Sequence, residues 1–136
     1  MQRIHNHSSS LLAAVALVLF FAGCNSSPPG KVKVQGTVNW NGQPLVNGSI
    51  QFFIIENDYL GGSAMIENGK FNFFCKPGKM RVEIAANRPS ASAGADERLP
   101  PSEHYIPDRY NAKSELTAEV TLDGENHFDF SLTEKP

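Results

Sequence analysis

The sequence has little positive charge and no apolar run long enough to form a permanent membrane span. It contains 12 Lys and Arg against 14 Asp and Glu, for a formal net charge of −2. Such a balance does not attract a protein to nucleic acid, so no nucleic-acid partner is expected. The apolar run at residues 11–22 falls well short of the roughly 20 residues that a transmembrane helix requires.

The first residues instead have the layout of a secretory signal. Arg3 precedes the apolar run, and the small residues Ala22 and Gly23 stand directly before Cys24. A basic end, an apolar stretch and a small-residue cleavage site are the three parts of an export signal. We therefore expect residues 1–23 to be a signal peptide that is removed.

The segment Phe21-Ala22-Gly23-Cys24 resembles the lipobox of bacterial lipoproteins. The resemblance implies cleavage before Cys24 and attachment of a diacylglyceryl group to its sulfur. Several acyl chains hold a protein firmly at a membrane, since each buried methylene contributes about 0.8 kcal/mol. An ordinary signal peptide followed by a chance cysteine is the alternative.

Residues 24–30 are then the lipidated cysteine and a short polar tether with two prolines. The residues after Cys24 can span at most roughly 20 Å, at about 3.3 Å each, so the domain is expected close to the membrane. Asn25 is not the aspartate that the resemblance associates with inner-membrane retention. We therefore expect a lipid-anchored protein of the cell envelope, at the outer membrane and facing the periplasm.

Cys75 is the only other cysteine in the sequence. If Cys24 carries the lipid, no disulfide can form within the chain, even in an oxidising compartment. We expect Cys75 to be a small, buried, apolar residue, with a reactive thiol or an intermolecular disulfide as the alternatives.

Strict alternation of apolar and polar residues dominates the chain after residue 30. One face of residues 31–40 carries Val32, Val34, Gly36, Val38 and Trp40. This period of two is the signature of a strand with one buried face. The same pattern predicts strands at residues 50–54, 63–67, 70–75, 79–86, 115–122 and 126–132, with Cys75 and Leu122 facing inward.

Turn signals separate these segments, and no sustained helical periodicity follows the apolar run. Turns are expected at Asn41-Gly42, Asn47-Gly48, Asn68-Gly69, Pro77-Gly78 and Asp123-Gly124. About seven short strands with one apolar face each, in roughly 100 residues, are typical of two packed sheets. The sequence therefore predicts an all-β domain over residues 31–134, a two-sheet antiparallel β-sandwich, with a barrel as the alternative.

Residues 87–113 interrupt the alternation with a proline-containing, Ala/Ser-rich stretch. This long loop exceeds the roughly 12–15 residues beyond which a structureless connection is unusual, so it is either functional or mobile. Residues 90–95 are expected to move freely, whereas the second half, with its bulky side chains, is expected to pack against the domain.

Tyrosines in the connections form a candidate recognition surface for a protein or glycan. Tyr105 and Tyr110 lie in the long loop, and Tyr59 is expected in another connection, near Gly61-Gly62. Exposed tyrosines on loops commonly make binding contacts. The alternative is that these rings pack against the sandwich.

The order of the turns and strands resembles the carboxypeptidase regulatory-like and transthyretin-like sandwiches. The resemblance covers nearly the whole chain after the tether, and its last segment resembles a bacterial lipoprotein group within that superfamily. It rests on Val34-x-Gly36-x-Val38, Asn41-Gly42-Gln43-Pro44-Leu45, Asn68-Gly69-Lys70-Phe71, residues 76–82 and Ile106-Pro107-Asp108-Arg109-Tyr110-Asn111. It implies a prealbumin-like β-sandwich fold.

No catalytic or metal-binding motif is recognisable. His104 and His127 fit no zinc-binding spacing, and the acidic residues near the C-terminus do not have the spacing of a calcium-binding loop. Some transthyretin-like proteins hydrolyse 5-hydroxyisourate with a C-terminal Tyr-Arg-Gly-Ser tail, whereas this sequence ends Thr133-Glu134-Lys135-Pro136. No catalytic residue, metal or cofactor is predicted, and the chain is not expected to be an enzyme.

These observations favour a membrane-anchored, non-enzymatic lipoprotein whose sandwich has a structural or binding role. Its expected partners are the membrane, through the lipid anchor on Cys24, and an envelope protein or glycan. A transthyretin-like module that binds a small ligand or carbohydrate is the alternative, and a hydrolase is the third hypothesis.

Overall fold

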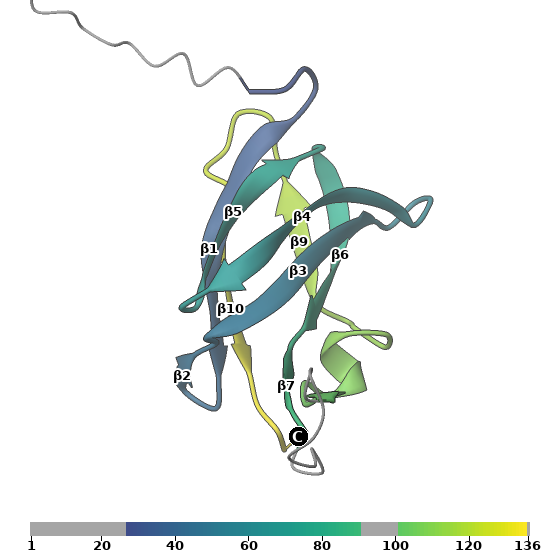
Figure 1. The fold of residues 1–136 in the computed structure, drawn as a ribbon. Coiled ribbons are helices and arrows are strands. Elements are labelled where there is room, and N and C mark those ends of the chain that lie inside the picture. The colour runs from purple at the N-terminus through teal and green to yellow at the C-terminus, as the bar shows by residue number, and fades with distance from the viewer. Residues whose placement is uncertain (1–26, 91–100, 136) are drawn as a thin grey trace, which may run out of the picture.

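The computed structural model describes residues 27–90 and 101–135. This part of the chain is almost entirely β-structure, with one short 3-10 helix (Figure 1). The expected signal peptide, the lipidation site Cys24, Asn25 and residues 91–95 of the expected mobile stretch lie outside the described residues. Among the helical segments that are described, none has the length and apolarity to cross a membrane.

Eight strands form one large sheet and two form a small one. The large sheet consists of β1 (Val32–Trp40), β2 (Gln43–Pro44), β3 (Asn47–Ile54), β4 (Tyr59–Glu67), β5 (Lys70–Cys75), β6 (Gly78–Ala85), β9 (Thr117–Val120) and β10 (His127–Leu132). The small sheet pairs β7 (Asn87–Pro89) with β8 (Ser102–His104), and the 3-10 helix η1 covers Asp108–Tyr110. The prediction of an all-β domain is therefore confirmed.

The large sheet curls so that its two halves face each other. Its strand order is β10-β1-β5-β4-β3-β6-β9, with β2 beside β1. In the middle of this order, β4 and β5 pair only at Glu67 and Lys70. This narrow join lets the half made of β10, β1 and β5 turn over the half made of β4, β3, β6 and β9 (Figure 1).

One neighbouring pair departs from the expected antiparallel arrangement. β10 runs parallel to β1, with Gly36 opposite Phe128, whereas the other pairs in the described sheets are antiparallel. β9 and β10 stand at opposite ends of the strand order, so the chain crosses from one half to the other between them. The expected turn at Asp123-Gly124 is therefore part of a crossing connection and does not close a hairpin.

Phenylalanine rings fill the space between the two halves. Phe52 of β3 lies 5.1 Å from Phe73 of β5 and 5.8 Å from Phe128 of β10, measured between ring centroids. Phe71 and Phe130 complete the cluster at 6.5 and 6.4 Å from Phe52. Full burial of one such side chain contributes about 1.5–3 kcal/mol, so these contacts hold the halves together.

The alternation of apolar and polar residues correctly predicted most of the buried side chains, but it was wrong beyond the end of β9. Val34, Val38, Cys75 and Ile84 are fully buried, as predicted. Leu122 was expected to face inward, yet it is 66% exposed, because β9 ends at Val120 and the chain then bends away.

The turns at Asn41-Gly42 and Asn68-Gly69 have positive φ at both residues, as predicted. The expected turn at Asn47-Gly48 is wrong, because both residues belong to β3. Gly48 allows the neighbouring strand to approach closely, because a Cβ at this position would lie 2.8 Å from the carbonyl oxygen of Ala85. The turn after β3 instead contains Asp58, with φ of 58°, whose N–H donates to the carbonyl oxygen of Ile54.

Candidate recognition surfaces

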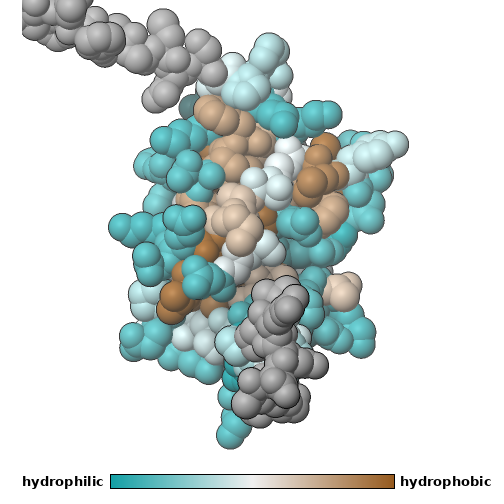
Figure 2. Space-filling view, in the orientation of Figure 1, coloured by the Kyte–Doolittle hydropathy of each residue, from teal (hydrophilic) through white to brown (hydrophobic). Residues whose placement is uncertain are grey.

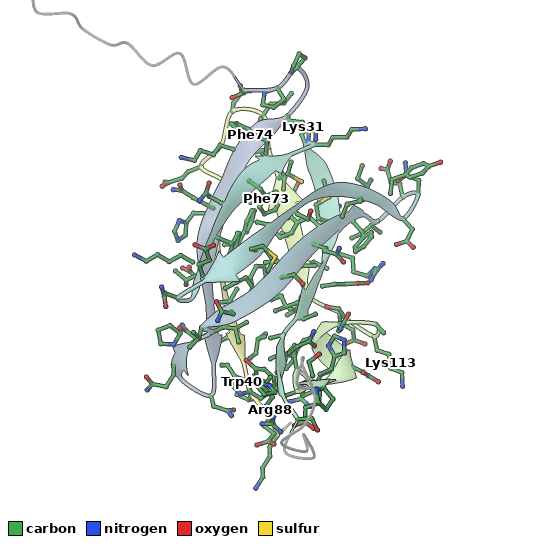
Figure 3. All side chains as sticks on the ribbon, in the orientation of Figure 1. Lys31, Trp40, Phe73, Phe74, Arg88 and Lys113 are labelled. Atoms are coloured by element: carbon green, nitrogen blue, oxygen red, sulfur yellow. The ribbon has the colours of Figure 1, made fainter. Side chains whose placement is uncertain are left out.

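Tyr105 packs at the end of the domain opposite residues 27–31, which lead into β1. Its ring makes an edge contact with Trp40, at 5.8 Å between centroids, and the Arg88 guanidinium lies 5.4 Å from the ring centroid. Arg88 also donates to Glu103 at 2.7 Å across the β7–β8 pair. Figure 3 shows Trp40 and Arg88 at this end. Tyr105 is half-buried and therefore holds the segment that follows β8 against the domain.

Tyr110 is held against the C-terminal strand from η1. Its hydroxyl accepts a hydrogen bond from the N–H of Thr133 at 3.2 Å and lies 3.4 Å from the Thr133 hydroxyl. Arg109 covers the ring at 4.7 Å and donates to the Thr133 carbonyl. The hydrogen bond with the Thr133 side chain, followed by that with Arg109, lowers the pKa of Tyr110 to about 8.

Tyr59 lies elsewhere and is open to solvent. It is the first residue of β4, and its side chain is 70% exposed, next to the turn between β3 and β4. Its N–H donates to the side-chain oxygen of Asn57 at 3.1 Å. The structure therefore does not bring Tyr59, Tyr105 and Tyr110 together on one surface.

Exposed apolar side chains are distributed along the β3–β4 hairpin, in which Tyr59 begins β4. Five of the six large apolar side chains that are exposed in the described residues come from residues 46–65. We call them the β3–β4 surface: Val46, Ile55, Tyr59, Leu60 and Met65. In Figure 2, apolar residues follow the middle of the face on which β3 and β4 lie in Figure 1, with hydrophilic residues on both sides.

A β-bulge interrupts the pairing beside Tyr59 and Leu60. Phe52 pairs with Gly62 and Phe53 pairs with Leu60, so Gly61 is an extra residue in β4. A bulge redirects the side chains next to it, and here the two preceding residues, Tyr59 and Leu60, are both exposed. A Cβ on Gly61 would lie 3.2 Å from the Cys75 sulfur, so this position is packed against the core.

Arg81 of β6 fixes the tip of the β3–β4 hairpin. Its guanidinium donates to Asp58 at 2.6 Å, also bonds Glu83, and lies 5.0 Å from the ring centroid of Phe53. The hydrogen bond with Asp58 contributes most to raising the pKa of Arg81, which stays positively charged. The apolar surface is therefore presented by a hairpin that is tied to its neighbour.

The two histidines of the domain lie apart. His104 is exposed in β8, and His127 begins β10, where its Nε2 lies 3.2 Å from Asp129. No three His, Cys, Asp or Glu residues within residues 27–90 and 101–135 are grouped so as to hold a metal ion.

The sequence interpretation singled out Tyr59 but missed its surroundings. The sequence feature that could have revealed exposed apolar residues here is the run Phe52-Phe53-Ile54-Ile55, in which apolar and polar residues do not alternate. A half-buried strand hides only every second side chain, so such a run near a turn leaves apolar residues in solvent.

No protein-family model matches the chain, and no curated protein matches it. Among solved structures, it is similar to the crystal structure of a 9R-lipoxygenase from Cyanothece PCC8801, with a TM-score of 0.43 and 14% sequence identity. The match covers 79% of this chain but 17% of the lipoxygenase chain, so this chain spans about a sixth of that protein.

Proposed function

We propose that the chain is a non-enzymatic, lipid-anchored protein of the cell envelope that binds a partner protein through the β3–β4 surface. The observation that carries the binding role is the concentration of Val46, Ile55, Tyr59, Leu60 and Met65 on one hairpin. Large apolar side chains that are exposed on one element and surrounded by polar residues are typical of an interaction site.

The anchor is proposed from the sequence around Cys24. β1 begins at Val32, so the eight residues from Cys24 allow at most roughly 25 Å of extended chain. A lipid on Cys24 would therefore hold the domain beside a bilayer, which we propose to be the outer membrane on its periplasmic side.

We also propose that the curled sheet is a β-sandwich of the prealbumin-like or carboxypeptidase regulatory-like type. The narrow join between β4 and β5 supports two sheets, and Phe52 supports their face-to-face packing through its contacts with β5 and β10.

Site-specific photo-crosslinking in intact cells tests the binding role. A photoreactive side chain at Met65 should yield a discrete adduct, whereas the same group at Leu122 should not, because Leu122 is equally exposed but lies outside the β3–β4 surface. Tyr59→Ser should weaken the Met65 adduct, since loss of an aromatic side chain that anchors an interface commonly costs about 2 kcal/mol or more in binding, roughly a 30-fold loss. Equal adducts from both positions would show that the hairpin has no special role.

Cell fractionation tests the anchor independently. Cys24→Ser should remove the acyl mass from the mature N-terminus and release the domain from the membrane fraction. Retention at the membrane without acylation would refute a lipid anchor and leave the binding role of the hairpin to be judged by crosslinking.

A further inference from the structure

The outer face of β1, between β5 and β10, carries a hollow with several polar side chains that the proposed function does not use. Its volume is about 340 Å³, and its polar lining comes from Lys33, Gln35, Thr37, Lys70, Asn72 and His127. Pockets for small ligands commonly have volumes of about 300–1,000 Å³. The hollow lies on the other half of the sheet from the β3–β4 surface.

Strand register places these side chains next to one another. Gln35 lies opposite Asn72 of β5 on one side and opposite His127 of β10 on the other. Thr37 lies opposite Lys70. Lys33 shares their face, because residues two apart in a strand point to the same side. Side chains directly opposite each other are about 5 Å apart at Cβ, so one small molecule can contact all three strands.

The charge of the hollow is positive, although the whole chain is slightly acidic. None of the residues that line it is acidic, and within the described residues neither Lys33 nor Lys70 forms an ion pair. Two carboxylates lie at its edge: Glu67 is opposite Lys70 in register, and Asp129 accepts from the Thr37 hydroxyl at 2.7 Å and lies 3.2 Å from His127 Nε2. These contacts hold Asp129 at the border and orient the imidazole.

The hollow continues toward the tether past an outward aromatic ring. A second hollow of about 320 Å³ shares Lys33 and Asn72 with the first and is also lined by Ser27 and Phe74. Phe74 lies opposite Lys33 in register and is half-buried (Figure 3). An aromatic face beside amide and hydroxyl groups suits a sugar, because the ring packs on its apolar side while Gln35, Asn72 and Thr37 pair with its hydroxyls.

We propose that this groove binds an anionic saccharide, with its phosphate or carboxylate between Lys33 and Lys70 and its sugar ring toward Asn72 and Phe74. Charge-assisted hydrogen bonds from the lysines supply the attraction for the oxyanion. The site depends neither on the lipid anchor nor on the β3–β4 surface.

Titration calorimetry of the full chain, purified from membranes in a non-ionic detergent, tests the site with four probes. Glucose 6-phosphate and glucuronate distinguish a phosphate from a carboxylate, and glucose and inorganic phosphate each supply half of the ligand. At least one charged sugar should bind saturably and at least fivefold more tightly than glucose or phosphate. No saturable binding of either charged sugar would overturn the proposal, and equal affinity for phosphate alone would overturn its sugar part.

Substitutions then locate the binding. Lys33→Gln and Lys70→Gln should each weaken binding at least fivefold, and Phe74→Ala should weaken the charged sugar but not phosphate. Lys113→Gln is the matched control, because this exposed lysine lies toward the other end of the domain (Figure 3). Unchanged melting temperatures would show that the variants fold. An equal loss in Lys113→Gln would assign the binding to overall charge and overturn the groove as its site.

Discussion

Asn126 and Thr121 are joined by two hydrogen bonds that close the connection between β9 and β10. The Asn126 side-chain oxygen accepts from the N–H of Thr121 at 2.8 Å, and its amide donates to the Thr121 carbonyl at 2.9 Å. The same amide lies 3.3 Å from the carbonyl oxygen of Gly124. Because β9 and β10 do not pair, this buried asparagine supplies the bonds that a hairpin ladder would otherwise provide.

Asn126→Ala should therefore lower the free energy of unfolding by about 1–3 kcal/mol, because it leaves the N–H and C=O of Thr121 without these partners. Urea denaturation measures the change. Asn126→Asp should retain the bond from Thr121 N–H but lose both bonds that the amide donates, so it also destabilises. Ser131→Ala, on an exposed face of β10, is the control and should have little effect. A stability change for Asn126→Ala no larger than that of the control would contradict this role.

Tyr110 should ionise at lower pH than an ordinary tyrosine. The Thr133 hydroxyl and Arg109 lower its pKa to about 8, whereas an unfolded tyrosine titrates near 10. The folded chain thus releases this proton first, so the contribution of Tyr110 to stability increases as the pH rises from about 8 toward 10 and is absent below pH 8. Ultraviolet absorbance should show a phenolate transition near pH 8.

Variants assign that transition. Tyr110→Phe should remove it, Thr133→Val should move it to higher pH, and Tyr59→Phe should leave it in place. A transition near pH 8 that persists in Tyr110→Phe would show that another group is responsible.

Cys75 should resist thiol reagents in the folded chain. It is fully buried, and burial raises the pKa of its thiol to about 11 despite the nearby charge of Lys31. In a Cys24→Ser chain at pH 8, labelling should be negligible before denaturation and rapid afterwards, because the thiolate is the reactive form. The raised pKa also implies that the contribution of Cys75 to stability is fully present below about pH 9 and declines as the pH rises toward 11. Prompt labelling of the native chain would be the contrary result.

Gly36 should tolerate no side chain. A Cβ there would lie 1.7 Å from the carbonyl oxygen of Phe128, on the strand that pairs in parallel with β1. Gly36→Ala should cost about 3 kcal/mol or more, because the two backbones must separate. Gly42→Ala is the informative comparison: its φ is +80° but nothing lies within 4 Å of the added atom, so strain alone should cost about 1–2 kcal/mol. Similar losses for both variants, measured by thermal unfolding, would contradict the steric explanation.

The strands and their buried faces could be predicted because they depend on neighbours in sequence. Alternation correctly placed Val34, Cys75 and Ile84 inside, and the two Asn-Gly turns with positive φ followed from residue chemistry. The same local rule was wrong for Asn47-Gly48. There the glycine does not form a turn but leaves room for the backbone of Ala85, which lies too close for a side chain. It was also wrong for Leu122, since alternation does not show where a strand stops pairing.

The candidate surfaces were only partly visible in the sequence. Tyr59 was singled out as an exposed side chain, but it begins β4 and does not lie in a connection as expected. Leu60 beside it is exposed next to the bulge at Gly61, and a bulge arises from the pairing of two strands. The polar groove depends on Gln35 lying between Asn72 and His127, which requires the register of three strands to be known.

The sequence by itself therefore determined which segments are strands, which side of each is apolar, and the lipobox motif from which we propose placement at a membrane. Only the tertiary structure decided that β10 lies parallel to β1, that β9 and β10 stand apart, and that the hollow on β1 and the β3–β4 surface lie on different halves of the sheet. The physical reason is that alternation records whether a side chain meets water or core, whereas the choice of partner strand depends on packing between residues far apart in the chain, such as Phe52 and Phe128.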